Sequence, residues 1–283
     1  MRIAIVGAGT VGTAVAVRWL GAGHTITAVA GREATRARAA RWLPGVDVVA
    51  IADAAAGAEI VVLGVPDDAI GDVAMSLVGR VEPGAWAIHL SGALGLGVLQ
   101  PLEGSGAHPL ALHPLQTFAD VEGAIEALPG AAIAVTARTD EGSALGGGLA
   151  HDLGGRPFLL ADEDRPLYHA AAVFASNYLV AVSGAALGLF TAAGVADAAD
   201  VMHPLQAATL ANVHRLGPQQ ALTGPAVRGD AGTIARNIDA VAAAAPALVP
   251  AYVTLCRTAM DVAGPRLSGE RRRAVEDVLA RWS

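Results

Sequence analysis

The sequence predicts an α/β protein: a Rossmann-like, mostly parallel sheet over residues 1–162, followed by an all-helical C-terminal domain over residues 163–283. Three observations lead to this prediction. Short β-rich runs alternate with helical patterns over the first domain, which is the signature of parallel βαβ units. Several of these runs are apolar on both faces, as strands are when helices cover both sides of a sheet. After Asp162 the β pattern stops and only helical patterns follow.

Eight short runs are the predicted strands, in chain order RIAIVGA, TITAVAG, VDVVAI, EIVVLGVP, AWAIHLSG, LALHPLQ, AAIAVTA and RPFLLA. The second domain reads as helices, with Gly or Pro near most of the breaks between them. The predicted helices cover residues 164–191, 197–214, 217–223, 230–244, 247–263 and 269–282.

Composition excludes several classes of protein. At 283 residues and 53% hydrophobic, the chain is long enough for two ordinary domains and too apolar to be disordered. A net charge of -7, with no basic cluster beyond Arg271, Arg272 and Arg273, argues against a nucleic-acid surface. Cys256 is the single cysteine, so no disulfide framework is possible, and no residue spacing indicates a metal site.

The start of the chain bears on its location. It begins strand-like at Arg2, without a charged leader region or cleavage site, and no apolar run of about 18 residues lacks Gly, Pro and polar interruptions. We therefore expect a cytoplasmic protein that is neither secreted nor membrane-spanning. All 19 basic residues are arginine, so no step of a reaction can depend on a lysine.

The strongest local signal is the stretch RIAIVGAGTVGTAVAVRWLGAG, in which a strand, the G-x-G-x-x-G spacing and a helix follow one another. Gly7 allows a tight turn, Gly9 lets the backbone approach a pyrophosphate, and Gly12 permits close packing of the helix on the strand. The N–H groups at the helix start complement the phosphates. The predicted cofactor-binding loop is Gly7, Ala8, Gly9, Thr10, Val11 and Gly12.

The residues after the second predicted strand favour NADP over NAD. An acidic residue at the end of this strand would bind a free ribose 2′-hydroxyl. Here the strand is predicted to end at Gly31, and Arg32 and Arg36 follow it, whose planar guanidinium groups suit a 2′-phosphate. Glu33 would reverse the preference if the strand ended two residues later.

Two further strand ends belong to the same site, because ligands bind outside the carboxyl ends of parallel strands. VVLGVPDDAI places Val65 and Pro66 along the middle of the cofactor, and AIHLSGALG places Ser91 and Gly92 at its nicotinamide end. Ser91 is a candidate hydrogen-bond partner of the nicotinamide or the substrate, although turn chemistry explains a Ser-Gly pair equally well. His113 is predicted at a rim, either as a substrate or cofactor contact or as a structural histidine.

The helix that opens the second domain, RPLYHAAAVFASNYLVAVSGAALGLF, is an apolar run interrupted by His169, Ser176 and Asn177. At 100° per residue, Ser176 lies about 20° and Asn177 about 80° from His169, so the three share one stripe. Such a stripe suits a cleft above a nicotinamide. The alternative is a set of hydrogen-bonded buried groups that fix the packing of the domains.

A turn in the second domain, within QALTGPAVRGDAGTIARNI, carries the last candidates. Arg228 is predicted to pair bidentately with a substrate carboxylate. Asp230 or Thr233 is predicted to cap the helix that follows.

GAGTVG, HLSGALG, LHPLQTF, YHAAAVFASNYLVA and ALTGPAVRGD, in this order, resemble a bacterial family that joins a Rossmann-like NADP-binding domain to a helical C-terminal domain of unknown function. The similarity covers nearly the whole chain. The family is similar to ketopantoate reductases, pyrroline-5-carboxylate reductases and β-hydroxyacid dehydrogenases, which reduce a C=O or C=N bond beside a carboxylate with NADPH. The resemblance implies an NADP-dependent reductase and leaves its substrate open.

One departure from these relatives matters. Ketopantoate reductases and β-hydroxyacid dehydrogenases use a lysine on the helix that faces the nicotinamide, and this chain has none. We expect His169 to donate the proton instead, with Asn177 and Ser91 positioning the oxygen and Arg228 holding the carboxylate.

The preferred prediction is therefore a reductase of a small oxo acid, with a ketopantoate-like substrate as first choice. An imine reductase resembling pyrroline-5-carboxylate reductase and a non-catalytic NADP-binding sensor or partner are the alternatives. The apolar helix that opens the second domain also predicts a homodimer.

Overall fold

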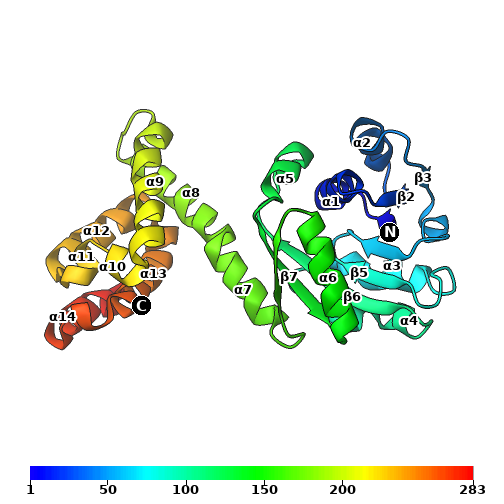
Figure 1. Ribbon diagram of the computed structural model, residues 1–283. Helices are drawn as coiled ribbons and strands as arrows, with labels where there is room; N and C mark the ends of the chain where they lie inside the picture. The colour runs from blue at the N-terminus through cyan, green and yellow to red at the C-terminus, as the bar shows by residue number, and fades with distance from the viewer. Residues whose placement is uncertain (283) are drawn as a thin grey trace. The chain divides into compact units, whose positions relative to one another are not determined.

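The computed structural model describes residues 1–282 and confirms the predicted class, a mostly parallel α/β sheet followed by helices (Figure 1). The chain forms two compact units, one covering Met1–Asn177 and the other beginning at Tyr178. The sheet ends at Leu159, so the first helix after the sheet belongs to the first unit. The domain boundary at residue 162 stays a prediction.

The eight predicted strands form one sheet with the order β3-β2-β1-β4-β5-β6-β7-β8. Their bounds are β1 (Arg2–Val6), β2 (Thr25–Ala30), β3 (Val48–Val49), β4 (Ile60–Leu63), β5 (Trp86–His89), β6 (His108–Leu115), β7 (Ala132–Ala137) and β8 (Arg156–Leu159). All neighbouring pairs are parallel except β6 and β7. The carboxyl ends of β1 to β6 therefore lie at one edge, where ligands bind in parallel sheets.

The first unit places helices on both faces of the sheet. They are α1 (Thr10–Gly21), α2 (Ala34–Trp42), α3 (Ile70–Ser76), α4 (Gln100–Glu103), α5 (Val121–Ala127), α6 (Asp140–Asp152) and α7 (Arg165–Ala175). Residues of α1, α5 and α6 share one buried cluster with the sheet, and residues of α3 and α4 share the other. The strands are thus apolar on both faces because both faces are covered.

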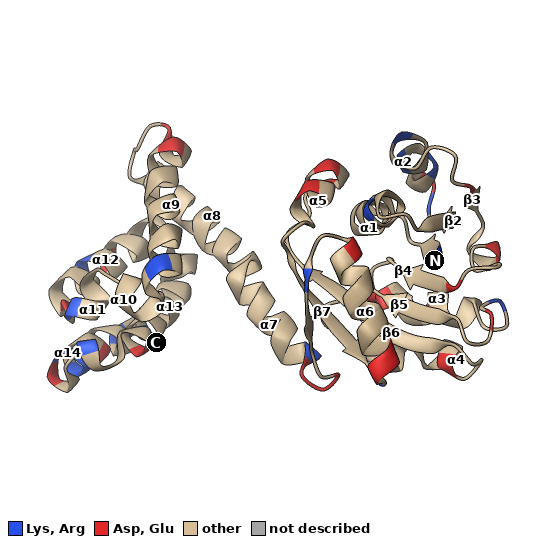
Figure 2. Cartoon of the chain, in the orientation of Figure 1, with Lys and Arg blue, Asp and Glu red and all other residues tan. Residues whose placement is uncertain are grey.

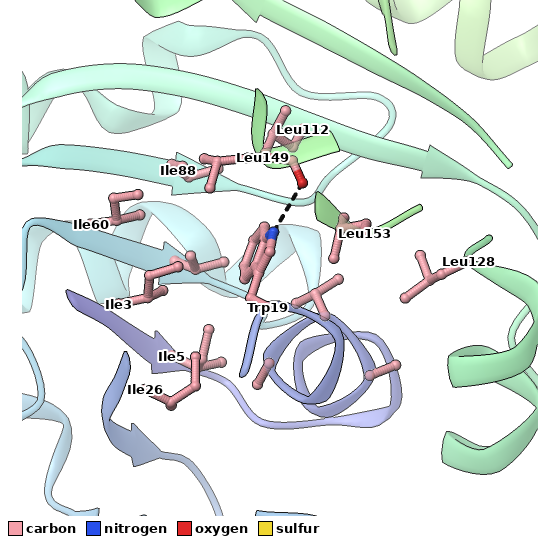
Figure 3. Close-up of a cluster of buried hydrophobic side chains, with 14 of the residues drawn as sticks. Ile3, Ile5, Trp19, Ile26, Ile60, Ile88, Leu112, Leu128, Leu149 and Leu153 are labelled. Carbon is pink, nitrogen blue, oxygen red and sulfur yellow. Dashed lines mark hydrogen bonds between the residues drawn. The ribbon is translucent and has the colours of Figure 1, made fainter. Parts of the chain in front are cut away.

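Alternation along β1 shows how one strand serves both clusters. Ile3 and Ile5 belong to the cluster under α1 and α6, whereas Ala4 and Val6 belong to the cluster under α3 and α4. Trp19 of α1 lies fully buried in the first cluster, and its indole N–H donates a hydrogen bond to the Leu149 carbonyl of α6 at 3.0 Å (Figure 3). This bond satisfies a buried donor and joins two helices on the same face.

The second unit is helical. Its helices are α8 (Asn177–Ala192), α9 (Ala198–Leu216), α10 (Pro218–Ala221), α11 (Pro225–Arg228), α12 (Ala231–Ala244), α13 (Val249–Ala263) and α14 (Gly269–Leu279). Ile234 and Ile238 of α12 pack in its core with Met260 of α13 and Val275 of α14. Asp230 caps α12, since its side chain accepts a hydrogen bond from the Thr233 N–H at 3.0 Å, as predicted.

The predicted single helix over 164–191 is wrong in one respect. It divides into α7 and α8 at Ser176, whose φ of -124° and ψ of -71° leave the helical region. Ala175 and Asn177 flank it, and neither Gly nor Pro marks the break. A stripe counted at 100° per residue therefore does not continue from His169 to Asn177.

The stretch Arg165–Ala192 is also long and apolar enough to cross a membrane, by length and composition alone. The sequence expectation concerned uninterrupted apolar runs, and Ser176, Asn177 and Gly184 do interrupt this stretch. That the protein does not span a membrane stays a prediction. A single such helix is only a weak indication of a membrane, because an apolar face that binds a protein passes the same test.

Charged side chains lie scattered over both units (Figure 2). Of the three consecutive arginines on α14, Arg272 pairs with Asp261 at 2.9 Å, and Arg271 donates to the Arg228 carbonyl at 3.1 Å. These arginines thus make contacts within the second unit. That the protein does not bind nucleic acid stays a prediction.

Candidate active site

The loop after β1 and the first turn of α1 contain three glycines, and the fold requires the absence of a side chain at two of them but not at the third. Gly7 has a φ of 99°, and a Cβ atom there would lie 2.6 Å from the backbone nitrogen of Val65. A Cβ atom on Gly12 would lie 2.3 Å from the Gly7 carbonyl oxygen. Gly9 has a φ of -76° and open space where its Cβ would be. Within residues 1–282, nothing requires Gly9 to lack a side chain, whereas a pyrophosphate approaching the backbone would.

The start of α1 also fits a dinucleotide. Gly9 is its N-cap residue and supplies no side-chain cap, so the first N–H groups of the helix have no side-chain acceptor. Arg38 of α2 donates a hydrogen bond from Nε to the Ala8 carbonyl at 2.8 Å and holds the loop from the other side. The sequence analysis did not identify Arg38, which follows Arg32 and Arg36 in the sequence, because it considered only those two arginines.

The end of β2 lies one residue earlier than predicted, at Ala30 rather than Gly31. Arg32 follows, and Glu33 is the N-cap residue of α2 rather than part of the strand. The condition that would have favoured NAD is thus not met. Arg32 and Arg36 are exposed, and within residues 1–282 neither guanidinium forms a hydrogen bond or ion pair. Their role toward a 2′-phosphate stays a prediction.

The loops after β4 and β5 are hydrogen-bonded to each other. Asp67 follows Val65 and Pro66, and its Oδ2 accepts a hydrogen bond from the Ser91 hydroxyl at 2.7 Å. The same hydroxyl oxygen accepts hydrogen bonds from the N–H groups of Ala93 at 3.2 Å and Leu94 at 3.1 Å. The turn chemistry that was the alternative for Ser91 is therefore present, and a contact with the substrate stays a prediction.

Two histidines meet at Gly92. A Cβ atom on Gly92 would lie 2.7 Å from Nε2 of His113 and 2.9 Å from Cδ2 of His169. The ring centroids of the two histidines are 6.4 Å apart. Nδ1 of His113 lies 2.7 Å from the hydroxyl oxygen of Tyr168. The loop after β5, strand β6 and helix α7 thus converge on one cluster, which includes the predicted residues Gly92 and His169.

Arg165, the first residue of α7, lies beneath this cluster and is completely buried. Its guanidinium donates hydrogen bonds to the Leu94 carbonyl at 2.5 Å, to Thr136 Oγ1 at 2.8 Å and to the Ser91 carbonyl. Burial lowers the pKa of Arg165. Three acceptors compensate for the loss of water around the guanidinium and fix the start of α7 to the loop after β5.

Burial and this cation set the protonation of the neighbouring groups. Burial first, then the charges of Arg165 and His169, lower the pKa of His113 to about 4. Burial raises the pKa of Tyr168 to about 12. Around neutral pH, His113 is therefore a neutral imidazole and Tyr168 a protonated phenol.

His89, the last residue of β5, is a third histidine near the cluster. It is completely buried, and burial followed by the charge of Arg165 lowers its pKa to about 3. Neither ring nitrogen forms a hydrogen bond of normal geometry, and the backbone of Gly95 offsets the loss only in part. The sequence does indicate this position, since a histidine interrupts the apolar strand two residues before the Ser-Gly turn.

Two predicted site residues lie apart from this cluster in the chain. Asn177 is exposed at the start of α8, beyond the break at Ser176. Arg228 is exposed at the end of α11 in the second unit. Their roles stay predictions. Within residues 1–282, no group of three or more His, Cys, Asp or Glu side chains could hold a metal ion.

Comparisons with known families agree with this architecture. Residues 1–114 match the family described as a Rossmann-like domain, and residues 131–259 match DUF2520, a domain of unknown function. The chain combines a Rossmann-like domain with a DUF2520 domain. The predicted resemblance to a family with this organisation is thus confirmed. The DUF2520 match includes the last two strands, β7 and β8, besides the helices up to α13.

Solved structures share the same organisation. A Bacteroides fragilis protein provisionally described as an NADP oxidoreductase is 26% identical, with a TM-score of 0.78 over 92% of this chain and 98% of that one. A reductive aminase from Aspergillus terreus, in complex with NADPH and ethyl levulinate, is 20% identical, with a TM-score of 0.70 over 98% of each chain. An imine reductase from Myxococcus stipitatus, in complex with NADP+, is 16% identical, with a TM-score of 0.67 over 100% of this chain and 99% of that one. The last two similarities show a shared fold alone, and no curated protein matches this chain.

Proposed function

We propose that the protein is an NADP-dependent reductase of a small oxo acid, with a ketopantoate-like acid as the first substrate to test. One observation carries the proposal. Contacts run from the glycine loop to the loop after β4, then through the bond between Asp67 and Ser91 to Gly92 and the two histidines. A dinucleotide bound at the glycine loop would extend along the carboxyl ends of the neighbouring strands of the sheet. Its nicotinamide would then lie near the loop after β5, where the two histidines are.

The chain offers groups for each part of the cofactor. The backbone of the loop from Gly7 to Gly12 would hold the pyrophosphate, and Arg32 with Arg36 would hold the 2′-phosphate. The backbone at Val65 and Pro66 would follow the middle of the cofactor. This choice of cofactor is supported by NADPH in the similar reductive aminase, by NADP+ in the similar imine reductase and by the description of the Bacteroides fragilis protein as an NADP oxidoreductase.

Reduction of the substrate C=O bond adds a hydride to the carbon and a proton to the oxygen, and gives an alcohol. NADPH supplies the hydride when it is bound. His169 gives its proton to the oxygen, a role open to a histidine near neutral pH. Asn177 and Ser91 position the oxygen, and Arg228 binds the carboxylate. The proposed reaction class, an NADP-dependent reduction, does not depend on which oxo acid is the substrate.

An imine reductase is the second candidate. The complete absence of lysine favours it, because an iminium ion already accepts a hydride without a strong acid beside it. Two of the similar structures are a reductive aminase and an imine reductase. A sensor or partner that binds NADP without turnover is the third candidate, but it would leave the histidine cluster and Arg228 without a use.

The same proposal includes a homodimer in the cytoplasm. In the second unit, Val180 of α8 and Leu205 and Leu210 of α9 are 69%, 61% and 52% exposed. Exposed apolar surface on neighbouring helices is typical of a protein interface. A second copy of the same chain is a partner that is present wherever the protein is made. Light scattering of the purified protein tests this, and a monomer at micromolar concentration would contradict it.

NADPH oxidation by a panel of 2-oxo acids and cyclic imines tests the proposed reaction. We expect turnover with at least one class, and a loss of about tenfold or more in kcat for His169→Ala with unchanged NADPH binding. His151→Ala is the matched control, because His151 is an exposed histidine of the same unit. Unaltered turnover in His169→Ala would refute the proton-donor role, and NADPH binding without turnover would favour the sensor.

A further inference from the structure

We propose that His113 is a second functional histidine: Tyr168 fixes the imidazole proton on Nε2, and this N–H donates a hydrogen bond to the reacting oxygen or nitrogen of the substrate. The inference rests on the proposed reductase function and deepens it. In this division of roles His169 transfers the proton, and His113 polarises the bond that is reduced.

The placement of the two ring nitrogens carries the first step. Nδ1 of His113 lies 2.7 Å from the Tyr168 hydroxyl, so this side of the ring is occupied. Nε2 has no hydrogen-bond partner within residues 1–282 and lies on the side of Gly92. Gly92 belongs to the loop after β5, at the predicted nicotinamide end of the site. The free nitrogen of a half-buried histidine is therefore the one that a substrate can reach.

The bond to Tyr168 decides which nitrogen carries the proton. An unprotonated imidazole nitrogen is a much stronger acceptor than a phenol oxygen, and a phenol is the better donor. Burial keeps Tyr168 protonated, since it raises the phenol pKa to about 12. Tyr168 therefore donates its O–H to Nδ1, and the single proton of a neutral imidazole is left on Nε2.

The surroundings of His113 keep it neutral. The titratable or charged groups that act on it are Arg165, Tyr168 and His169 of α7 and His89 of β5. None of these is a carboxylate that would stabilise an imidazolium. Burial together with Arg165 and His169 lowers the His113 pKa to about 4. His113 then lacks a second proton at neutral pH and acts as a hydrogen-bond donor, not as the acid.

Gly92 explains why the N–H stays accessible. A Cβ atom at this position would lie 2.7 Å from Nε2, inside the distance of ordinary van der Waals contact. Any side chain would displace the ring or cover its free nitrogen. The Ser-Gly pair thus combines a turn-forming serine with a glycine that leaves room for two imidazoles.

The first test reads the tautomer directly and does not depend on activity. Nitrogen-15 NMR of the whole protein should show His113 as the Nε2–H tautomer, unprotonated from about pH 5 to about pH 9. Tyr168→Phe should give a mixture of both tautomers, whereas Tyr252→Phe, which alters a phenol of the second unit, should not. An Nδ1–H tautomer in the unaltered protein, or no change in Tyr168→Phe, would overturn the inference.

The second test asks whether the substrate meets this N–H. In the presence of NADP+, oxamate, an unreactive analogue of a 2-oxo acid, should shift the Nε2 resonance of His113, also in His169→Ala. Once a reducible substrate is known, His113→Leu should lower kcat by about a hundredfold, and His113→Gln, which keeps an N–H donor, by less. NADPH binding should stay unchanged in both variants.

Different results separate this inference from the proposed function. No turnover with any substrate, together with a fixed Nε2–H tautomer that responds to oxamate, would count against the reductase and for the donor role of His113. Turnover that survives His113→Leu unchanged would count against His113 alone. An Nε2 resonance that oxamate does not move would also overturn the contact.

Discussion

The carboxylate of Asp67 accepts a hydrogen bond from the hydroxyl of Ser91 across 2.7 Å, and this bond joins the loops that follow β4 and β5. The hydroxyl oxygen also accepts two backbone N–H groups of its own turn. Its single proton is thus given to Asp67. The donor and both lone pairs of the hydroxyl are thus in use, so Ser91 could donate to a substrate oxygen only by giving up its bond to Asp67.

Ser91→Ala therefore has an expected cost in stability. It removes one donor and one acceptor and leaves two turn N–H groups without a partner, so we expect a loss of about 1–3 kcal/mol in the free energy of unfolding. Urea denaturation of the purified protein measures this. Ser76→Ala, at an exposed serine that bonds only to the carbonyl three residues earlier in its own helix, should change little. An unchanged urea midpoint for Ser91→Ala would show that the hydrogen bonds contribute no stability.

Gly9→Ala separates cofactor binding from folding. The backbone at Gly9 suits any residue and nothing lies within 4 Å of the added methyl group, so the free energy of unfolding should not fall. NADPH binding should weaken by about tenfold or more, because the methyl group would occupy the space of the pyrophosphate. Calorimetric titration measures the affinity.

Two further glycine variants serve as references for this result. Gly21→Ala also meets open space but lies at the far end of α1, and should bind NADPH normally. Gly7→Ala should destabilise the protein, since its φ is positive and the methyl group would overlap the loop after β4. Normal NADPH affinity in Gly9→Ala would remove the main argument for the dinucleotide site.

Arg32→Ala tests the choice between the two dinucleotides. Loss of a guanidinium that binds the 2′-phosphate should weaken NADPH by about tenfold and leave NADH unchanged. Arg41→Ala, at an exposed arginine near the end of α2, is the control. An equal loss of affinity for NADPH and NADH would contradict the role of Arg32 in binding the 2′-phosphate. Arg36→Ala should also weaken NADPH binding and leave NADH binding unchanged.

The fold could be read from the sequence because its signals are local. All eight strands were predicted, since β1 and its parallel neighbours are apolar runs bounded by turn residues. The cap of α12 at Asp230 was predicted from residue type and position. The break at Ser176 was not, because no Gly or Pro marks it and the polar Ser176 and Asn177 were interpreted as one stripe of a continuous helix.

The site was less predictable for physical reasons. Tyr168 and His113 are 55 residues apart, with β7, α6 and β8 between them in the chain. Local periodicity contains no information on such a contact. Arg165 was overlooked because an arginine at the first turn of a helix is ordinarily exposed, and only its three acceptors reveal that it is buried.

The two buried histidines also predict how stability depends on pH. In the folded protein the pKa values of His113 and His89 are lowered from the ordinary 6.5 to about 4 and about 3. Below about pH 6.5 the unfolded chain therefore binds protons that the folded protein does not take up. Stability is fully present above this pH and is lost as the pH falls toward the folded pKa values, by up to about 1.4 kcal/mol per pH unit for each histidine.

Urea unfolding between about pH 7.5 and about pH 5 should show this decline before most carboxylates titrate. His89→Leu removes one of the two buried bases and a side chain without a normal hydrogen-bond partner. We expect the decline to become shallower in this variant, and its stability at pH 5 to equal or exceed that of the unaltered protein. His151→Ala, at an exposed histidine, should keep the original slope. Equal slopes in His89→Leu and the unaltered protein would show that His89 takes up its proton in the folded state, and hence that the strand end beneath Ser91 admits water.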